Sequence, residues 1–143
     1  MIEKTCFWNI RSVNTQESFE RLMDLKRRHH YSYIALMEPF QGPYDLDKYK
    51  SRLGMDKAMA NYSSKIWVFW NADWEAEVIS DSYQQISIKF KHGRLQRDFV
   101  ILAVNAKCCA LERLELWENL EYVAEGINHP WLVGGDFNVI LDE

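Results

Sequence analysis

The sequence contains few of the residues that mark several protein classes. Its 143 residues include only three cysteines, and two of them, Cys108 and Cys109, are adjacent. An odd cysteine number without a C-x-x-C pair excludes a disulfide scaffold and a cysteine zinc site, and favours free buried thiols in a reducing compartment. No apolar run approaches the roughly 18 residues that a membrane helix needs. We therefore expect an intracellular protein with no signal peptide, no transmembrane segment and no membrane partner.

The sequence also lacks an excess of basic residues. Lysine and arginine number 17 against 21 aspartate and glutamate, which gives a net charge of −4. This balance excludes a strongly basic, histone-like protein, so any contact with nucleic acid must come from a local basic patch. Aromatic residues are abundant instead, at 14% with six tryptophans. Because aromatic side chains bury large areas, the composition predicts a substantial core.

The first part of the chain has the pattern of a strand–helix–strand unit. Apolar runs at 5–10 and 33–37 predict buried strands. Between them, Asn14 is the expected N-cap of a helix, and Glu17 would complete a capping box. This order predicts that the two strands pair in parallel through a right-handed crossover.

The rest of the chain is predicted to be mostly β, with one long helix near its end. A short helix at 45–53 precedes five predicted strands, which cover 58–61, 65–70, 75–80, 84–91 and 98–106. Apolar residues then recur every three or four positions, which predicts an amphipathic helix with a buried stripe of Leu111, Leu114, Trp117, Leu120, Ala124 and Ile127. Gly126 is the expected C-cap, and a last strand covers 131–134.

Polar residues stand where three of these predicted strands end. Asn9 follows the first strand, Glu38 follows the second, and Asp136 and Asn138 follow the last. If these strands lie side by side, their carboxyl ends bring the amides and carboxylates into one pocket. Such an oxygen-rich set suits Mg²⁺ together with a phosphate group. The alternative interpretation is that each residue belongs to an ordinary turn or a solvated strand end.

Three segments resemble the successive motifs of the endonuclease/exonuclease/phosphatase superfamily. They are Trp8-Asn9-Ile10-Arg11, Leu36-Met37-Glu38 and Gly134-Gly135-Asp136-Phe137-Asn138, in the family's order along nearly the whole chain. Their residues are most similar to those of the endonuclease domain of plant LINE-type non-LTR retrotransposons. The segments Lys65-Ile66-Trp67-Val68 and 112–117 share this similarity. The resemblance implies an α/β fold, namely the N-terminal part of a four-layer α/β/β/α sandwich (DNase I-like). Residues 1–143 would then be a partial domain that lacks the C-terminal motifs.

The resemblance also implies a reaction and a role for each residue. The reaction would be Mg²⁺-dependent hydrolysis of a DNA phosphodiester, in the nucleus if a retroelement expresses the protein. Asn9 and Glu38 would hold Mg²⁺ or Mn²⁺, Asp136 would orient or deprotonate the attacking water, and Asn138 would contact the scissile phosphate. Asn105 stands where the family often has a phosphate-binding tyrosine, so it is expected to be a weak phosphate ligand.

Departures from the family pattern leave other functions open. Ser12-Val13 replace the family's Gly and Leu, and the terminal Asp-His pair is absent, so impaired activity is expected. One alternative is a non-catalytic retrotransposon remnant or nucleic-acid-binding fragment, and another is a phosphatase of a small phosphoester. The sequence does not predict an oligomeric state. A partial sandwich rich in aromatic residues should also expose an apolar sheet surface.

Overall fold

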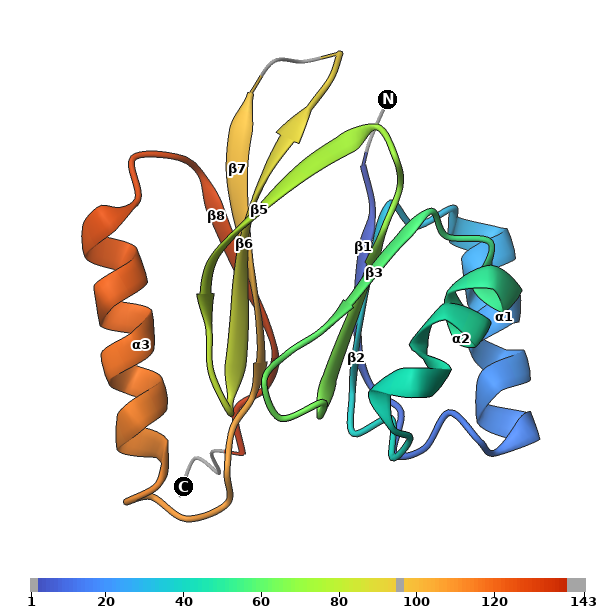
Figure 1. Cartoon of the computed structure of the whole chain (residues 1–143), viewed down its shortest axis with the longest axis horizontal. Coiled ribbons are helices and arrows are strands. Elements are labelled where there is room, and N and C mark those ends of the chain that lie inside the picture. Colours follow the sequence, from blue (N-terminus) through green and yellow to red (C-terminus); the bar gives the residue numbers. More distant parts are fainter. Residues whose placement is uncertain (1–2, 95–96, 139–143) are drawn as a thin grey trace.

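The computed structural model describes residues 3–94 and 97–138, which form two four-stranded sheets packed face to face (Figure 1). Sheet A has the order β1 (Thr5–Asn9), β2 (Tyr33–Met37), β4 (Ile66–Trp70) and β3 (Lys57–Ala60). Sheet B has the order β5 (Trp74–Asp81), β6 (Gln85–His92), β7 (Asp98–Asn105) and β8 (Trp131–Asp136).

Helices cover the outer faces of both sheets, which makes four layers (Figure 1). Helices α1 (Gln16–His29) and α2 (Leu46–Leu53) lie on sheet A, the latter after a short 3-10 helix, η1 (Pro43–Asp45). Helix α3 (Arg113–Gly126) lies on sheet B. The predicted α/β sandwich is therefore confirmed. No helix in the part of the chain that the structure describes is both long and apolar enough to cross a membrane.

Two parallel strand pairs bring the polar residues of the predicted site to one end of the sandwich. β1 pairs in parallel with β2, and β7 pairs in parallel with β8, while the other pairs are antiparallel. The prediction that all three site strands lie side by side is wrong, because β8 belongs to sheet B. The edge strands β1 and β8 instead face each other across the sandwich. The site therefore forms between two sheets rather than along one.

The aromatic residues fill both buried layers of the molecule. Between the sheets, the Tyr33, Trp74 and Phe90 rings contact one another, with centroids 5.2 to 6.4 Å apart. Under α1 and α2, the Phe19 and Tyr49 rings pack edge to face at 5.3 Å. All five residues of β4 are buried, since this strand is central in sheet A and covered on both faces.

The N-terminal capping prediction for α1 is wrong. The helix begins at Gln16 after Thr15, and no side chain caps it. Asn14 lies in the preceding turn, where its backbone N–H donates to Ser12 Oγ at 3.3 Å. This local hydrogen bond places Asn14 in the turn before the helix rather than at its N-cap, so the capping box with Glu17 does not form.

The predicted buried stripe of α3 is also wrong, because four of its six residues are exposed: Leu111, Leu114, Trp117 and Ala124. Leu120 and Ile127 are half-buried, and the fully buried residues are instead Leu116 and Val123, which pack against sheet B. Leucines occur on more than one face of this helix, so spacing alone did not identify the face that packs. Gly126 is the last helical residue, and the extended residue Ile127 is the C-cap.

The cysteines are free, as predicted, but their predicted burial is wrong. Cys108 and Cys109 are exposed, and Cys6 is half-buried. The adjacent pair follows β7, in the turns that lead to α3 rather than in a core strand.

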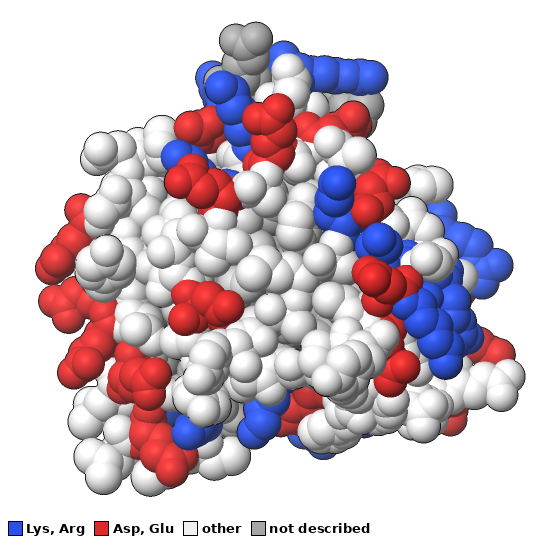
Figure 2. Space-filling model, in the orientation of Figure 1, with Lys and Arg blue, Asp and Glu red and all other residues white. Residues whose placement is uncertain are grey.

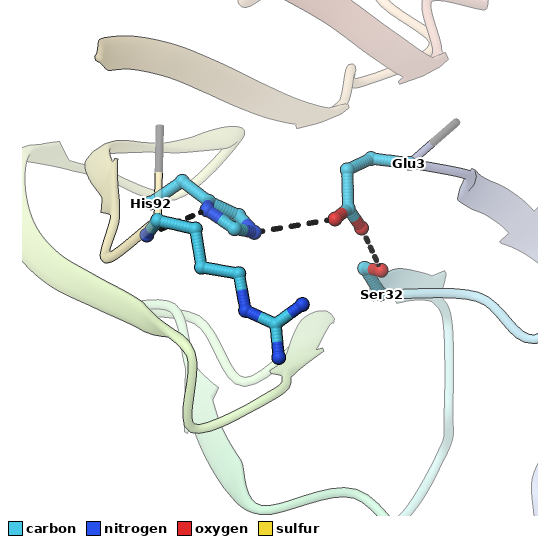
Figure 3. A network of polar contacts seen from close by, with 4 residues as sticks. Glu3, Ser32 and His92 are labelled. Carbon is cyan, nitrogen blue, oxygen red and sulfur yellow. Dashed lines mark hydrogen bonds and ion pairs between the residues drawn. The ribbon is translucent and has the colours of Figure 1, made fainter. Parts of the chain in front are cut away.

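A polar cluster joins the sheets at the end away from the predicted site (Figure 3). The Glu3 carboxylate accepts a hydrogen bond from the Ser32 hydroxyl and lies 3.3 Å from His92 Nε2. His92 Nδ1 accepts from the Arg94 backbone N–H at 3.1 Å, so Nε2 is the ring nitrogen that can donate to the Glu3 carboxylate. Because the carboxylate separates the hydroxyl from the imidazole, the cluster lacks the serine–histidine contact of a catalytic triad. It ties the start of β1 and β2 to the end of β6.

Charge is distributed unevenly between the two outer layers. Acidic side chains gather on the α3 side of the molecule and basic ones on the α1 and α2 side (Figure 2). The basic residues of those two helices are Arg21, Lys26, Arg27, Arg28, Lys48, Lys50 and Arg52. A net charge of −4 therefore coexists with a basic face.

Candidate functional site

The centre of the candidate site is a hydrogen bond between the ends of β1 and β8. The Asn9 side-chain amide donates to Asp136 Oδ2 at 2.9 Å. Asn9 is the last residue of β1 and Asp136 the last of β8, so the bond joins sheet A to sheet B. The structure thus brings together two of the residues that the sequence placed at strand ends.

Two glycines before Asp136 allow β8 to approach its neighbours. A Cβ on Gly134 would lie 2.7 Å from three ring carbons of Phe7 on β1. Gly135 has a φ of +130°, and a Cβ there would lie 2.1 Å from the Val104 carbonyl oxygen on β7. Larger residues would push β8 away from β1 and β7, so the Gly-Gly pair sets the position of Asp136.

Asn138 holds the second oxygen of the same carboxylate. Its backbone N–H donates to Asp136 Oδ1 at 2.9 Å, in a turn where Asn138 has a φ of +48°. Its side-chain amide donates to the Ala106 carbonyl oxygen. With Asn9 on Oδ2 and Asn138 on Oδ1, the Asp136 carboxylate has a fixed orientation and still has free lone pairs for a water molecule.

The carboxylate lies in a cavity of about 680 Å³ between the two sheets. Its polar and charged lining comes from Asn9, Arg11, Cys108, Asp136 and Asn138. The exposed residue Arg11 contributes a guanidinium group, which is suited to an anionic substrate group. Arg11 lies in the first motif, but the sequence assigned no role to it.

Glu38 and Asn105 line a second, adjoining cavity of about 270 Å³. Glu38 follows β2 with a φ of +55°, its N–H donates to the Lys65 carbonyl at 2.8 Å, and its carbonyl accepts from Ser12 at 2.9 Å. Asn138 and Cys108 line both cavities. The five predicted residues therefore gather at one end of the sandwich, but Glu38 is not in the cavity of Asn9 and Asp136.

Two buried amide oxygens at the site lack a hydrogen-bond partner among the described residues. They are Asn9 Oδ1 and Asn105 Oδ1. Asn105 is only 7% exposed and is opposite Asp136 in the register of β7 and β8. An unpaired buried acceptor costs about 1–3 kcal/mol, so each oxygen would be stabilised by a donor or cation that a ligand supplied.

The residues present fit a hard divalent cation with few protein ligands. Within the described ranges, no cluster of three or more His, Cys, Asp or Glu side chains could hold a metal ion. The unpaired amide oxygen of Asn9 and the carboxylates of Asp136 and Glu38 are nevertheless the oxygen donors that Mg²⁺ accepts when substrate and water complete its shell.

Two lysine side chains that were not predicted as site residues also line the second cavity. Lys65 and Lys107 line it with Glu38, Asn105 and Glu112. Lys65 directly precedes β4, and Lys107 lies two residues after β7. Nothing in their local spacing marks them, because their meeting depends on how the two sheets pack.

Neither a comparison with models of protein families nor one with curated proteins gives a match. Solved structures do match, at low sequence identity. Zebrafish (D. rerio) TDP2 complexed with a single-strand DNA product has a TM-score of 0.68 and 14% identity, over 95% of this chain and 60% of that one. The endonuclease domain of TRAS1, a telomere-specific non-LTR retrotransposon, has a TM-score of 0.67 and 10% identity, over 93% and 59%.

A sugar phosphatase is also among the structural neighbours. The mannosyl-6-phosphatase Bt3783 of Bacteroides thetaiotaomicron has a TM-score of 0.66 and 16% identity, over 94% of this chain and 64% of that one. The chain therefore spans about 60% of the length of these neighbours. The neighbours are of the endonuclease/exonuclease/phosphatase type, and the two sheets with their outer helices are the DNase I-like fold of that group.

Proposed function

We propose that the site hydrolyses phosphodiester bonds of DNA with the help of a divalent metal ion. The observation that supports this most is the Asp136 carboxylate, held through both oxygens by Asn9 and Asn138 at a cavity of about 680 Å³. A fixed carboxylate with free lone pairs can orient a water molecule and accept its proton. The neighbouring guanidinium of Arg11 can pair with a phosphate oxygen.

The proposed metal ligands are Asn9 and Glu38, which line adjoining cavities, so the Mg²⁺ or Mn²⁺ ion would lie where the two cavities meet. A bound ion would neutralise phosphoryl charge and lower the barrier to displacement. Two further side chains would contact the substrate. Asn138 uses one amide hydrogen for Ala106 and has a second available for the scissile phosphate. Asn105, with its amide oxygen unpaired, would be a weak phosphate ligand through its NH₂ group.

The structural neighbours support phosphoester chemistry in a wide sense. One was solved with single-strand DNA product and another is a retrotransposon endonuclease domain. The amino-acid sequences of the three motifs further support an origin in a plant LINE-type retrotransposon. A protein of that origin would act on DNA in the nucleus.

Plasmid nicking tests the proposal directly. We expect the purified chain to nick supercoiled DNA with Mg²⁺ and to stop when the metal is chelated. Asp136→Ala should lower the rate at least about 100-fold, the usual contribution of a positioned base. Asp73→Ala is the matched control, because Asp73 is an exposed carboxylate in the loop before β5. Nicking by Asp136→Ala at the wild-type rate would overturn the assignment.

A phosphatase acting on a small phosphoester is the second candidate, favoured by the resemblance to a mannosyl-6-phosphatase. Release of phosphate from a sugar phosphate, with plasmid left intact and the same dependence on Asp136, would identify it. Tight DNA binding with no hydrolysis of either substrate would instead identify a non-catalytic binding fragment.

A further inference from the structure

Two exposed tyrosines form a pair beside the second cavity. Tyr62 lies between β3 and β4 and Tyr83 between β5 and β6, with ring centroids 5.0 Å apart and planes at 75°. Tyr62 is 69% exposed and Tyr83 is 50% exposed, so much of their ring surface faces solvent. Tyr83 lines the cavity that contains Glu38 and Asn105. The pair thus borders the candidate site.

Hydrogen bonds between the two loops fix this aromatic pair in place. The Tyr62 N–H donates to Asp81 Oδ1 at 2.7 Å, and the Ser63 hydroxyl donates to the Tyr83 carbonyl at 2.9 Å. The buried Asn61 amide donates to the Ser82 carbonyl at 2.9 Å. One loop belongs to sheet A and the other to sheet B, so these bonds hold the rings across the sandwich. A surface ordered before binding loses less entropy when a ligand arrives.

Positive charge accompanies the aromatic surface. Lys107 Nζ lies 5.4 Å from the centre of the Tyr83 ring, and Lys65 lines the same cavity. Asn138, which holds Asp136, lines this cavity too. An aromatic face next to ammonium groups matches a nucleotide, because the base can stack while the phosphate pairs with lysine.

We propose that Tyr62 and Tyr83 form a stacking platform for an unpaired nucleobase of the substrate, next to the phosphoester that the site cleaves. This inference rests on the proposed function and narrows its substrate class. A base inside a duplex has both faces covered by its neighbours, so the platform suits single-stranded or locally unpaired nucleic acid. A sugar phosphate has no base that could stack on the platform.

Binding without catalysis tests the platform. Fluorescence anisotropy with EDTA present would compare a labelled single-stranded DNA oligomer with an abasic oligomer of equal length. We expect the wild type to bind the base-containing oligomer about tenfold more tightly, the scale of one stacked base. Tyr62→Leu and Tyr83→Leu should lose this preference and keep their affinity for the abasic oligomer. Tyr62→Phe and Tyr83→Phe should retain it.

Tyr122→Leu is the matched control, since Tyr122 is 70% exposed on α3, away from the site. Equal affinity of the wild type for both oligomers would overturn the platform. The platform would also be overturned if the leucine variants lost the same affinity for both oligomers. It would likewise be overturned if Tyr122→Leu lost the preference for the base-containing oligomer to a similar extent. Base preference without cleavage of either plasmid or the single-stranded oligomer in Mg²⁺ would instead overturn the hydrolytic function and leave the platform in place.

Discussion

The Asn9 amide donates to Asp136 Oδ2 at 2.9 Å, and this bond connects the ends of two strands that are 127 residues apart. Asn9 ends an edge strand of one sheet and Asp136 an edge strand of the other. A neutral donor here stabilises the carboxylate and keeps the amide oxygen of Asn9 turned away and unpaired. One side chain thus orients the proposed base and offers an oxygen to the proposed metal.

Replacing this donor with a second acid tests both roles. Asn9→Asp places two carboxylates in contact and removes the hydrogen bond, so the melting temperature should fall in EDTA. Mg²⁺ should restore most of the loss, because a cation between the carboxylates removes their repulsion. Thermal unfolding with and without Mg²⁺ measures this. Asn14→Asp, at an exposed position, is the control and should respond to neither condition. An Asn9→Asp melting temperature insensitive to Mg²⁺ would contradict a metal at this position.

The close approach of β8 to β1 predicts a compensating pair of substitutions. Gly134→Ala should destabilise the fold by about 1–3 kcal/mol, the usual cost of overpacking, since its Cβ meets the Phe7 ring. Adding Phe7→Leu should recover part of that loss, so that the double variant is more stable than the sum of the single changes. Urea unfolding measures the three free energies.

Gly126→Ala provides the control for a glycine without such a contact. A Cβ at Gly126 would meet nothing within 4 Å. At this helical position alanine should be neutral or stabilise by up to about 1 kcal/mol. Strict additivity of Gly134→Ala and Phe7→Leu would show that the ring does not limit the approach of β8.

The edge of the sandwich next to β8 predicts binding of hydrophobic dyes. A cavity of about 650 Å³ opens there, lined by apolar residues of both β7 and β8. Trp131 and Leu132 are 47% and 44% exposed at its rim. Dye fluorescence should be high for the wild type and should fall in Trp131→Lys at unchanged helix content. Trp117→Lys on α3, where Trp117 is 39% exposed, is the control. Equal dye signals in all three proteins would contradict the prediction. They would also remove support for the proposal that residues 1–143 are a partial domain, which was expected to expose an apolar sheet surface.

The strands and the first parallel pair, β1 with β2, could be predicted because their signals are local. An apolar run of strand length, a helix and a second apolar run are enough to predict β1, α1 and β2, and the structure has them at Thr5–Asn9, Gln16–His29 and Tyr33–Met37. The packed face of α3 could not be predicted. Its leucines occupy two faces, and only contact with β7 and β8 selects Leu116 over Leu114.

The placement of the candidate residues at strand ends could be predicted, but their arrangement could not. Asn9, Glu38 and Asp136 each follow an apolar strand, which the linear sequence shows. The meeting of Asn9 with Asp136 depends on two sheets facing each other, and no local pattern contains that information. For the same reason Glu38 came to line a second cavity with Lys65 and Lys107. The tyrosine pair of residues 62 and 83 lies in loops of different sheets and has no signature in the sequence.

The buried residue Tyr33 predicts how stability depends on pH in the alkaline range. Tyr33 is 1% exposed between the sheets, and this burial raises the pKa of its hydroxyl well above the ordinary value of a tyrosine. Below about pH 10 both states keep the proton and its contribution to stability is complete. Above about pH 10 the unfolded chain releases the proton while the folded chain retains it, so the free energy of unfolding should fall by about 1.4 kcal/mol per pH unit.

Tyr33→Phe should remove this one-proton slope, because phenylalanine has no hydroxyl to ionise and fills nearly the same volume. Urea unfolding at about pH 8 and about pH 10.5 should therefore show a smaller loss of stability for the variant than for the wild type. Tyr44→Phe is the control, since Tyr44 is 97% exposed and stays in contact with solvent in the folded protein. Identical losses in the wild type and Tyr33→Phe would mean that Tyr33 ionises in the folded protein, and that the core between the sheets admits water at high pH.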